Sequence, residues 1–160
     1  KSLKEKPVYY YPMIYEAKPL LNSGLLSDYK SLKNNLDWDS FVKDTKNSLK
    51  ETKKLINLDK SLGNKNTADS VAYSLVLRAR GFYIIENILK GKLWEKKGFL
   101  ERIKKATGNL DIYNRYLYLK GNNDGKGNTI SINCAEKFVN YIEKEISKWE
   151  NMKKGRERKG

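Results

Sequence analysis

The longest mainly apolar stretch of the chain covers residues 67–90, with the sequence TADSVAYSLVLRARGFYIIENILK. On a period of 3.6 residues its apolar side chains fall on three neighbouring stripes, which together cover most of a helix. Thr67 or Asp69 is the candidate capping residue, because a side-chain oxygen there can accept a free backbone N–H. Gly91 follows the stretch, as glycine does at left-handed helix ends. The pattern predicts a central helix around which the rest of the domain packs.

Amphipathic patterns on both sides of this stretch predict further helices. The clearest has apolar residues at i, i+3, i+4, i+7, i+11 and i+14, starting from Ala135. No segment shows the alternation of apolar and polar residues that is typical of a strand. The predicted fold class is all-α, a bundle of about five helices around the central one. The flanking helices are expected within 23–34, from 37–40 to about 58, and over 99–107, 110–120 and about 133–152.

The two ends of the chain differ from its middle. Residues 1–22 hold all three prolines and four of the tyrosines, and prolines so close together forbid a long helix. We therefore expect residues 1–36 to form an N-terminal arm and a short helix, with the tyrosine rings packed on the domain or stacked on bases. The helical bundle domain is expected over 37–152. Residues 153–160, KKGRERKG, lack apolar anchors and are expected to be a basic disordered tail.

The charge of the chain narrows its range of partners. The net charge is +14, from 33 basic and 19 acidic residues. The basic excess is largest over residues 91–109, just after the central stretch, and over 153–160. Such a distribution attracts polyanions, so the expected partner is a nucleotide or a nucleic acid. The alternative is that lysines simply cover solvated faces.

Several features bear on the compartment. Cys134 is the single cysteine, so an internal disulfide is excluded and a reducing compartment is the default. No apolar run is long enough to cross a bilayer, and no leader pattern is present. The expected location is cytoplasmic, without membrane contact. The sequence begins at Lys1 rather than at methionine, as expected of a piece excised from a longer protein, and it leaves the oligomeric state open.

The usual catalytic residues are scarce. The chain has no histidine, which removes the commonest general base, the usual zinc ligand and every Ser-His or Cys-His pair. Cys134 begins the last predicted helix, where a thiol can be activated, but a buried small apolar role is favoured. We therefore expect no catalytic residue in this chain.

Two short segments resemble ligand-binding motifs in part. Asp37 and Asp39 could bind Mg²⁺ as paired carboxylates, but acidic residues are also favoured at a helix start, and that use is preferred here. The segment 121–128, GNNDGKGN, is one residue short of a phosphate loop. It also places Lys126 where a calcium loop needs a ligand. We expect a flexible connection there and no metal site.

One group of residues remains as a candidate binding surface. It would combine guanidinium and ammonium groups with an aromatic ring, which suits phosphates and bases. The alternative is structural, with Arg78 paired to Glu86, or Arg80 paired to another acid, and the lysines solvated. The candidate residues are Arg78 and Arg80 in the central helix, Lys92, Lys96 and Lys97 after it, and Tyr113 and Arg115 in the next long helix.

The residues in this region carry a resemblance to a known family. The segment LVLRARGFYIIENILKGKLWEKKGF (75–99), followed by DIYNRYLYLKG (111–121), resembles the helical C-terminal domain of archaeal nucleotidyltransferases of the DNA-polymerase-β type. The similarity covers roughly residues 68–150. The residues at matching places are Arg78, Arg80, Leu89, Gly91, Lys92, Lys97, Phe99, Tyr113, Arg115, Ala135, Glu136, Glu145 and Ile146.

This resemblance implies a domain that follows a nucleotidyltransferase core upstream of Lys1 and helps to bind the nucleotide or its acceptor. Substrate binding would then fall to Arg78, Arg80, Lys92, Lys97, Tyr113 and Arg115. The family's catalytic signature, a Gly-Ser turn followed by an Asp-x-Asp strand, is absent from residues 1–160. The chain alone is therefore expected to be non-catalytic and without cofactor, with Mg²⁺ expected only in that core.

Two alternatives belong to other functional classes. The first is a free-standing basic helical module that binds RNA or DNA without catalysis. Its affinity would fall steeply with salt. The second is a structural or dimerising bundle that uses Trp149 or the tyrosines of the N-terminal arm.

Overall fold

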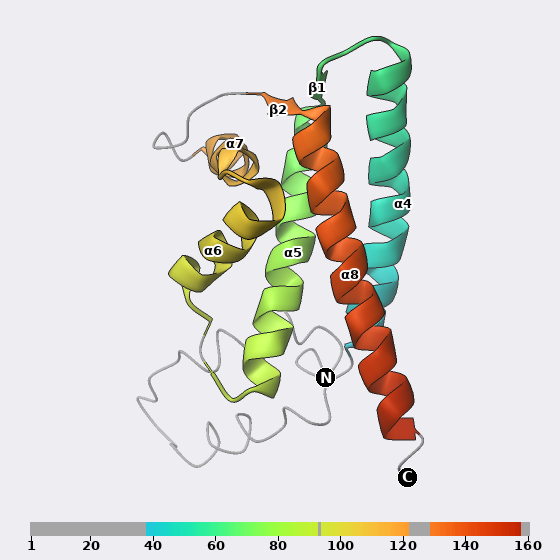
Figure 1. The fold of residues 1–160 in the computed structure, drawn as a ribbon, viewed down its shortest axis with the longest axis vertical. Helices are drawn as coiled ribbons and strands as arrows, with labels where there is room; N and C mark the ends of the chain where they lie inside the picture. The colour runs from blue at the N-terminus through green and yellow to red at the C-terminus, as the bar shows by residue number, and fades with distance from the viewer. Residues whose placement is uncertain (1–37, 93, 122–128, 158–160) are drawn as a thin grey trace.

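The computed structural model describes residues 38–92, 94–121 and 129–157 of the chain. This part forms an all-α bundle with one very small sheet, which confirms the predicted fold class (Figure 1). The predicted N-terminal arm, with its short helix and Asp37, lies outside the described residues, as do 122–128 and 158–160. The elements are α4 (Asp39–Ser61), β1 (Asn66–Thr67), α5 (Asp69–Leu89), α6 (Lys96–Thr107), α7 (Asp111–Leu119), β2 (Ile130–Ser131) and α8 (Ile132–Glu157).

Three long helices, α4, α5 and α8, lie side by side and contact one another, as Figure 1 shows. The two shorter helices lie on the side of this group away from α4, where α7 packs against α5 and α6 packs against α8. Helix α5 therefore contacts α4, α7 and α8. This is the central place that its apolar sequence predicts, because a helix that is apolar on most sides needs neighbours on most sides.

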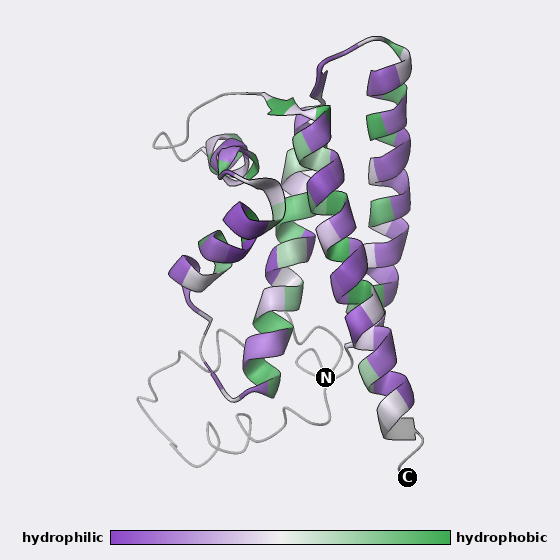
Figure 2. Cartoon of the chain, in the orientation of Figure 1, coloured by the Kyte–Doolittle hydropathy of each residue, from purple (hydrophilic) through white to green (hydrophobic). Residues whose placement is uncertain are grey.

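The core is built on α5, and apolar positions of this helix stand out in Figure 2. Phe82 packs edge-to-face with Phe41 of α4, with ring centroids 5.3 Å apart. Gly81 makes this contact possible, because a Cβ there would lie 2.1 Å from Cζ of Phe41. A glycine inside a helix costs about 1 kcal/mol relative to alanine. Here that cost accompanies a close approach of α4 to α5.

The start of α5 differs from the prediction. Neither Thr67 nor Asp69 caps the helix, because the capping position is Ala68 and no side chain makes a capping hydrogen bond. The backbone N–H of Ala68 donates to Oδ2 of Asp59 at 3.1 Å. The Asp69 carboxylate accepts instead from Arg115 of α7. At the other end, Gly91 has the predicted left-handed conformation, with φ of 67°.

The small sheet was not expected from the sequence. β1 pairs antiparallel with β2, with Asn66 opposite Ser131 and Thr67 opposite Ile130. Each strand has two residues, too few for an alternating pattern to appear. The sheet joins the chain before α5 to the chain before α8.

Helix α8 extends beyond its predicted end near residue 152 and continues to Glu157. The prediction of a disordered tail is therefore wrong over residues 153–157. Asp39, at the start of α4, supplies a tertiary partner: its Oδ2 accepts from Lys153 at 2.5 Å and its Oδ1 from Trp149 at 3.3 Å. Contacts of this kind can prolong a helix whose own sequence provides no apolar anchor.

Helices α4 and α8 are also joined by a regular series of ion pairs, which we call the α4–α8 ion-pair ladder. Its partners recur every seven residues on both antiparallel helices, a spacing of two helical turns. Each side chain is about half exposed, so each pair alone adds little stability. The pairs are Lys46 with Glu150, Lys53 with Glu143 and Lys60 with Glu136.

Helix α6 begins at Lys96, three residues before its predicted start, and ends at Thr107. The capping residue Gly108 follows and is left-handed, with φ of 93°. Gly98 lies within the helix, where a Cβ would be 2.4 Å from the hydroxyl oxygen of Tyr83. This glycine lets α6 pack closely against α5. Among the described residues, no helix combines the length and apolar character needed to cross a membrane.

Candidate ligand pocket between α5 and α7

A pocket of about 420 Å³ opens where α5, the start of α6 and the end of α7 meet. Its volume is within the range of small-molecule sites, about 300–1,000 Å³. Its lining combines aromatic and basic side chains, and none of the described residues that line it is acidic. These residues are Arg80, Trp94, Lys96, Phe99, Tyr113, Tyr116, Leu117, Lys120 and Gly121.

The aromatic part of the pocket is a connected set of rings. Trp94 contacts Phe99 edge-to-face, with ring centroids 6.4 Å apart. Phe99 contacts Tyr113 at 6.1 Å, and Tyr113 contacts Tyr116 at 5.9 Å. Rings that pack on one another in this way hold fixed positions. Burial raises the pKa of the Tyr113 hydroxyl above its ordinary value, so this group stays neutral and can donate a hydrogen bond near pH 7.

Arg80 of α5 is one of three cations among the described residues that line the pocket. Its guanidinium carbon lies 4.8 Å from the centroid of the Trp94 ring, a cation–π arrangement. Its Nε atom is buried and has no hydrogen-bond partner among the described residues. Leaving a buried donor without an acceptor costs about 1–3 kcal/mol, and more for a charged group. Arg80 therefore has an unused donor within a protein wall that supplies no carboxylate.

Tyr116 shows the same feature on the α7 side. Its side chain is 3% exposed, and its buried hydroxyl has no partner among the described residues. The ammonium of Lys120 lies 5.5 Å from the centroid of the same ring. Unsatisfied buried polar groups are rare in folded proteins and call for an explanation such as a bound molecule. Both residues that carry these atoms, Arg80 and Tyr116, line this one pocket.

The structure brings together only part of the predicted binding surface. Arg80, Lys96 and Tyr113 line the pocket. Arg115 does not, because its guanidinium bonds to Asp69 at 2.6 and 2.8 Å and stacks over Tyr118. That pair ties α7 to the start of α5. Of the remaining predicted residues, Arg78, Lys92 and Lys97 are also absent from the lining.

The structural alternative for Arg78, an ion pair with Glu86, is also wrong. Glu86 accepts instead from Arg102 of α6, at 2.5 Å, and from Lys90. Lys148 of α8 lies 3.6 Å from the same carboxylate. The hydrogen bond from Arg102 is the main cause that lowers the pKa of Glu86 to about 2. Glu86 therefore joins α5, α6 and α8 rather than neutralising the central arginines.

Sequence reasoning missed much of the pocket lining, namely Trp94, Phe99, Tyr116 and Lys120. Part of it carried a signal in the sequence. Tyr113, Tyr116 and Lys120 are separated by three and four residues, which places them on one face of α7. Trp94 carried no such signal, because it precedes α6 in a connection whose path depends on the neighbouring helices.

The other chemically notable residues have structural roles here. Cys134 is buried, as predicted, and burial raises the pKa of its thiol, which keeps it protonated and unreactive. Asp39 bonds to Trp149 and Lys153. Within the described ranges, no three potential metal ligands come together.

Comparison with known proteins leaves the chain without a match. No family model, no curated protein and no solved structure matches it. Conclusions about function therefore rest on the pocket and its surroundings.

Proposed function

We propose that this helical domain binds a nucleotide, either free or as the terminal unit of a nucleic-acid acceptor, in the pocket between α5 and α7. One observation carries the proposal: the described lining of the pocket combines aromatic rings with the cations Arg80, Lys96 and Lys120 and holds no acid. Two of the lining residues, Arg80 and Tyr116, also have a buried polar atom without a partner among the described residues. A nucleotide offers what these groups lack, because its phosphate, sugar and base all carry hydrogen-bond acceptors.

Different residues of the lining would bind the phosphate and the base of the nucleotide. Lys96 and Lys120 are exposed and flank the pocket, so they would attract the phosphate and screen its charge. Arg80 would donate to an acceptor deeper in the pocket. The rings of Trp94 and Tyr113 would pack against the base, and such stacking contributes about 1–3 kcal/mol per base.

The proposal extends to substrate binding in a nucleotidyltransferase. Its support is the sequence resemblance, whose two segments, 75–99 and 111–121, include all of the described residues that line the pocket. Transfer chemistry and Mg²⁺ would belong to a catalytic core outside this chain. A cytoplasmic location is part of the proposal, and the unpaired Cys134 supports it. The alternative, a free-standing module that binds RNA or DNA, would use the same pocket for a terminal nucleotide.

Nucleotide binding can be tested by titrating the protein with AMP and ATP while the indole N–H signals of its tryptophans are followed by NMR. We expect the Trp94 signal to shift, and a Trp94→Phe variant assigns that signal. The double variant Lys96→Gln/Lys120→Gln should bind ATP at least about tenfold more weakly, since charge-assisted contacts contribute about 1.5–3 kcal/mol each.

The matched control removes two charges elsewhere. Lys43 and Lys50 lie exposed on α4, and replacing both by glutamine should leave ATP affinity within about twofold of the parent. The proposed pocket would be refuted if both double variants bound ATP equally weakly. It would also be refuted if only the indole N–H signals of Trp38 and Trp149 shifted. Inorganic triphosphate as a competitor separates a phosphate site from a site that also reads the base.

A further inference from the structure

A second cavity, which we call the α6–α8 cleft, lies between those two helices and has a volume of about 520 Å³. Its lining is dominated by cations. Glu145 is the only acid among the described residues that line it. The cations are Arg102 and Lys105 of α6 and Lys137, Lys144 and Lys148 of α8.

The cleft is separate from the nucleotide pocket. Helix α6 contributes Lys96 and Phe99 to the pocket, but Arg102 and Lys105 to the cleft. The two cavities share no described lining residue. The pocket therefore meets the first half of α6 and the cleft its second half, and a variant in one leaves the side chains of the other in place.

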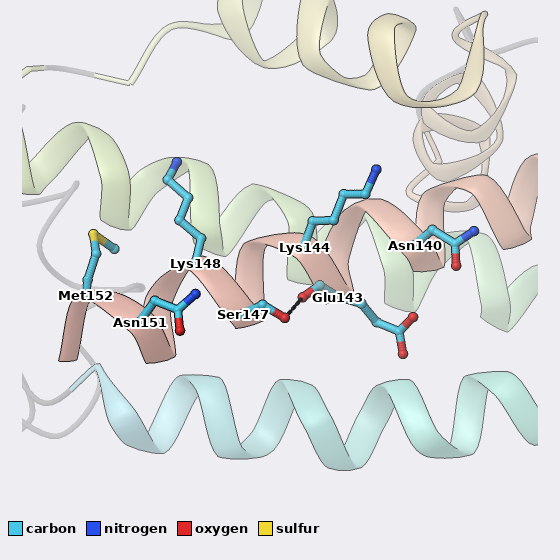
Figure 3. Close-up of a pocket in the computed structure, with 7 residues that line it drawn as sticks. All are labelled: Asn140, Glu143, Lys144, Ser147, Lys148, Asn151 and Met152. Atoms are coloured by element: carbon cyan, nitrogen blue, oxygen red, sulfur yellow. Dashed lines mark hydrogen bonds between the residues drawn. The ribbon is translucent and has the colours of Figure 1, made fainter. Parts of the chain in front are cut away.

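The charge of the cleft arises from the way α8 sorts its charged residues between two neighbours. Its acidic residues Glu136, Glu143 and Glu150 belong to the α4–α8 ion-pair ladder. Two of the cleft lysines lie on another side of α8, as Figure 3 shows: Lys144 and Lys148 extend away from α4, whereas Glu143 points toward it. The acidic residues of the ladder are thus paired with lysines of α4, and they do not neutralise the lysines of α8 that line the cleft.

Three of the cleft lysines lack a counter-ion. Lys105, Lys137 and Lys144 make no ion pair or hydrogen bond within the described ranges. The other two cations of the cleft, Arg102 and Lys148, each lie close to a carboxylate. Arg102 bonds to Glu86, and Lys148 lies 3.9 Å from Glu145. The cleft therefore concentrates uncompensated positive charge in a concave surface, where the field is stronger than on a convex one.

We propose that the α6–α8 cleft binds the phosphate backbone of a single-stranded nucleic acid. This goes beyond nucleotide binding in the pocket and does not depend on it. Lys137 and Lys148 stand eleven positions apart along α8, a distance of about 16 Å at 1.5 Å per residue. That row can contact several successive phosphates of one strand. The proposal commits to a single strand, because proteins that bind single strands track the backbone with a positively charged groove.

The lining favours a nucleic acid over an acidic protein. None of the large apolar side chains exposed in the described part of the chain lines the cleft. Protein interfaces have a central region enriched in aromatic and apolar groups, and the described lining of this cleft offers only the partly buried Tyr141 and Ala106. Interfaces with nucleic acid are more polar and far more positive, which matches the lining.

The test uses fluorescence anisotropy with a labelled 20-nucleotide oligo(U) at several NaCl concentrations. We compare the parent with the triple variant Lys105→Gln/Lys137→Gln/Lys144→Gln. For single strands, the slope of log K against log salt is about −0.7 per neutralised phosphate. Removing three lysines should therefore make the slope shallower by about 2 and lower the affinity at least about tenfold at 50 mM salt.

The matched control is Lys43→Gln/Lys50→Gln/Lys65→Gln, which removes the same charge from exposed positions outside the cleft. All lysines changed in both variants are exposed, so we expect both variants to fold as the parent does. Circular dichroism and thermal unfolding check this. The proposal is overturned if both variants lose the same affinity, if oligo(U) does not bind, or if a 20-base-pair duplex or poly-glutamate binds as tightly.

The same variants separate this proposal from the nucleotide pocket. The cleft variant should retain the parent's affinity for ATP, and the pocket variant Lys96→Gln/Lys120→Gln should retain most of the salt slope for oligo(U). A pocket variant without effect on ATP would remove the proposed nucleotide site and leave the cleft standing.

Discussion

Glu86 provides the sharpest energetic prediction, because one carboxylate joins three helices. Its side chain is 15% exposed and pairs with Arg102 of α6 and Lys90 of its own helix. Lys148 of α8 lies close by. We consider the substitution Glu86→Gln, which keeps the size of the side chain but removes the charge.

The magnitude follows from the pKa of this group. The hydrogen bond from Arg102 lowers the pKa of Glu86 from 4.5 to about 2. One pKa unit corresponds to about 1.4 kcal/mol, so the ionised carboxylate stabilises the fold by about 3 kcal/mol at pH 7. A lowered pKa means that this stability is full well above pH 4.5 and is lost as the pH falls toward 2. By the same relation, about 1.5 kcal/mol remains at pH 3.

The assay is urea unfolding followed by circular dichroism at pH 7 and pH 3, for the parent and Glu86→Gln. We expect the substitution to cost about 3 kcal/mol at pH 7 and about half of that at pH 3. The control is Glu101→Gln, which removes an exposed carboxylate from α6 and should cost less than about 0.5 kcal/mol. A cost for Glu86→Gln that is equal at both pH values would refute the argument, since a purely steric loss does not titrate.

Two further predictions concern packing and the ion-pair ladder. Gly98→Ala should destabilise the protein by about 1–3 kcal/mol, because the new methyl group meets the Tyr83 hydroxyl. Tyr83→Phe in the same chain should recover at least about 1 kcal/mol in a double-mutant cycle, and additive costs would contradict the clash. Lys53→Gln should cost less than about 1 kcal/mol, because its pair with Glu143 is about half exposed. Urea unfolding in 1 M NaCl should reduce that cost further, whereas a loss above about 2 kcal/mol would show that the ladder acts as a unit.

The arrangement has a consequence for specificity. Each pair of the α4–α8 ion-pair ladder contributes little stability. The ladder nevertheless keeps three acidic residues of α8 on the α4 side, so the side of α8 that faces the cleft is basic. Exchanging the two charges of one pair, for example by Lys53→Glu with Glu143→Lys, would preserve an ion pair between the helices. It would also place a lysine on the side of α8 that faces α4. The charge of the cleft depends on this sorting rather than on the net charge of α8.

Much of the helical architecture could be read from the sequence. The apolar circumference of 67–90 predicted the central helix, and glycines at 91 and 108 marked helix ends that are left-handed in the structure. These are local properties, because helix periodicity and the freedom of glycine at positive φ act within a few residues. The two-residue strands and the end of α8 at Glu157 were not predicted, because they depend on partners far away in the chain.

The sequence by itself therefore determined the helical class, the central helix and the positive character of the protein. Only the tertiary structure decided which cations are neutralised: Arg115 pairs with Asp69, and Arg102 with Glu86. It also decided that Arg80, which has a buried donor without a partner among the described residues, lines a pocket of aromatic rings. The physical reason is that a charge acts over the distance in space to its neighbours. Helix packing sets that distance between residues far apart in the chain.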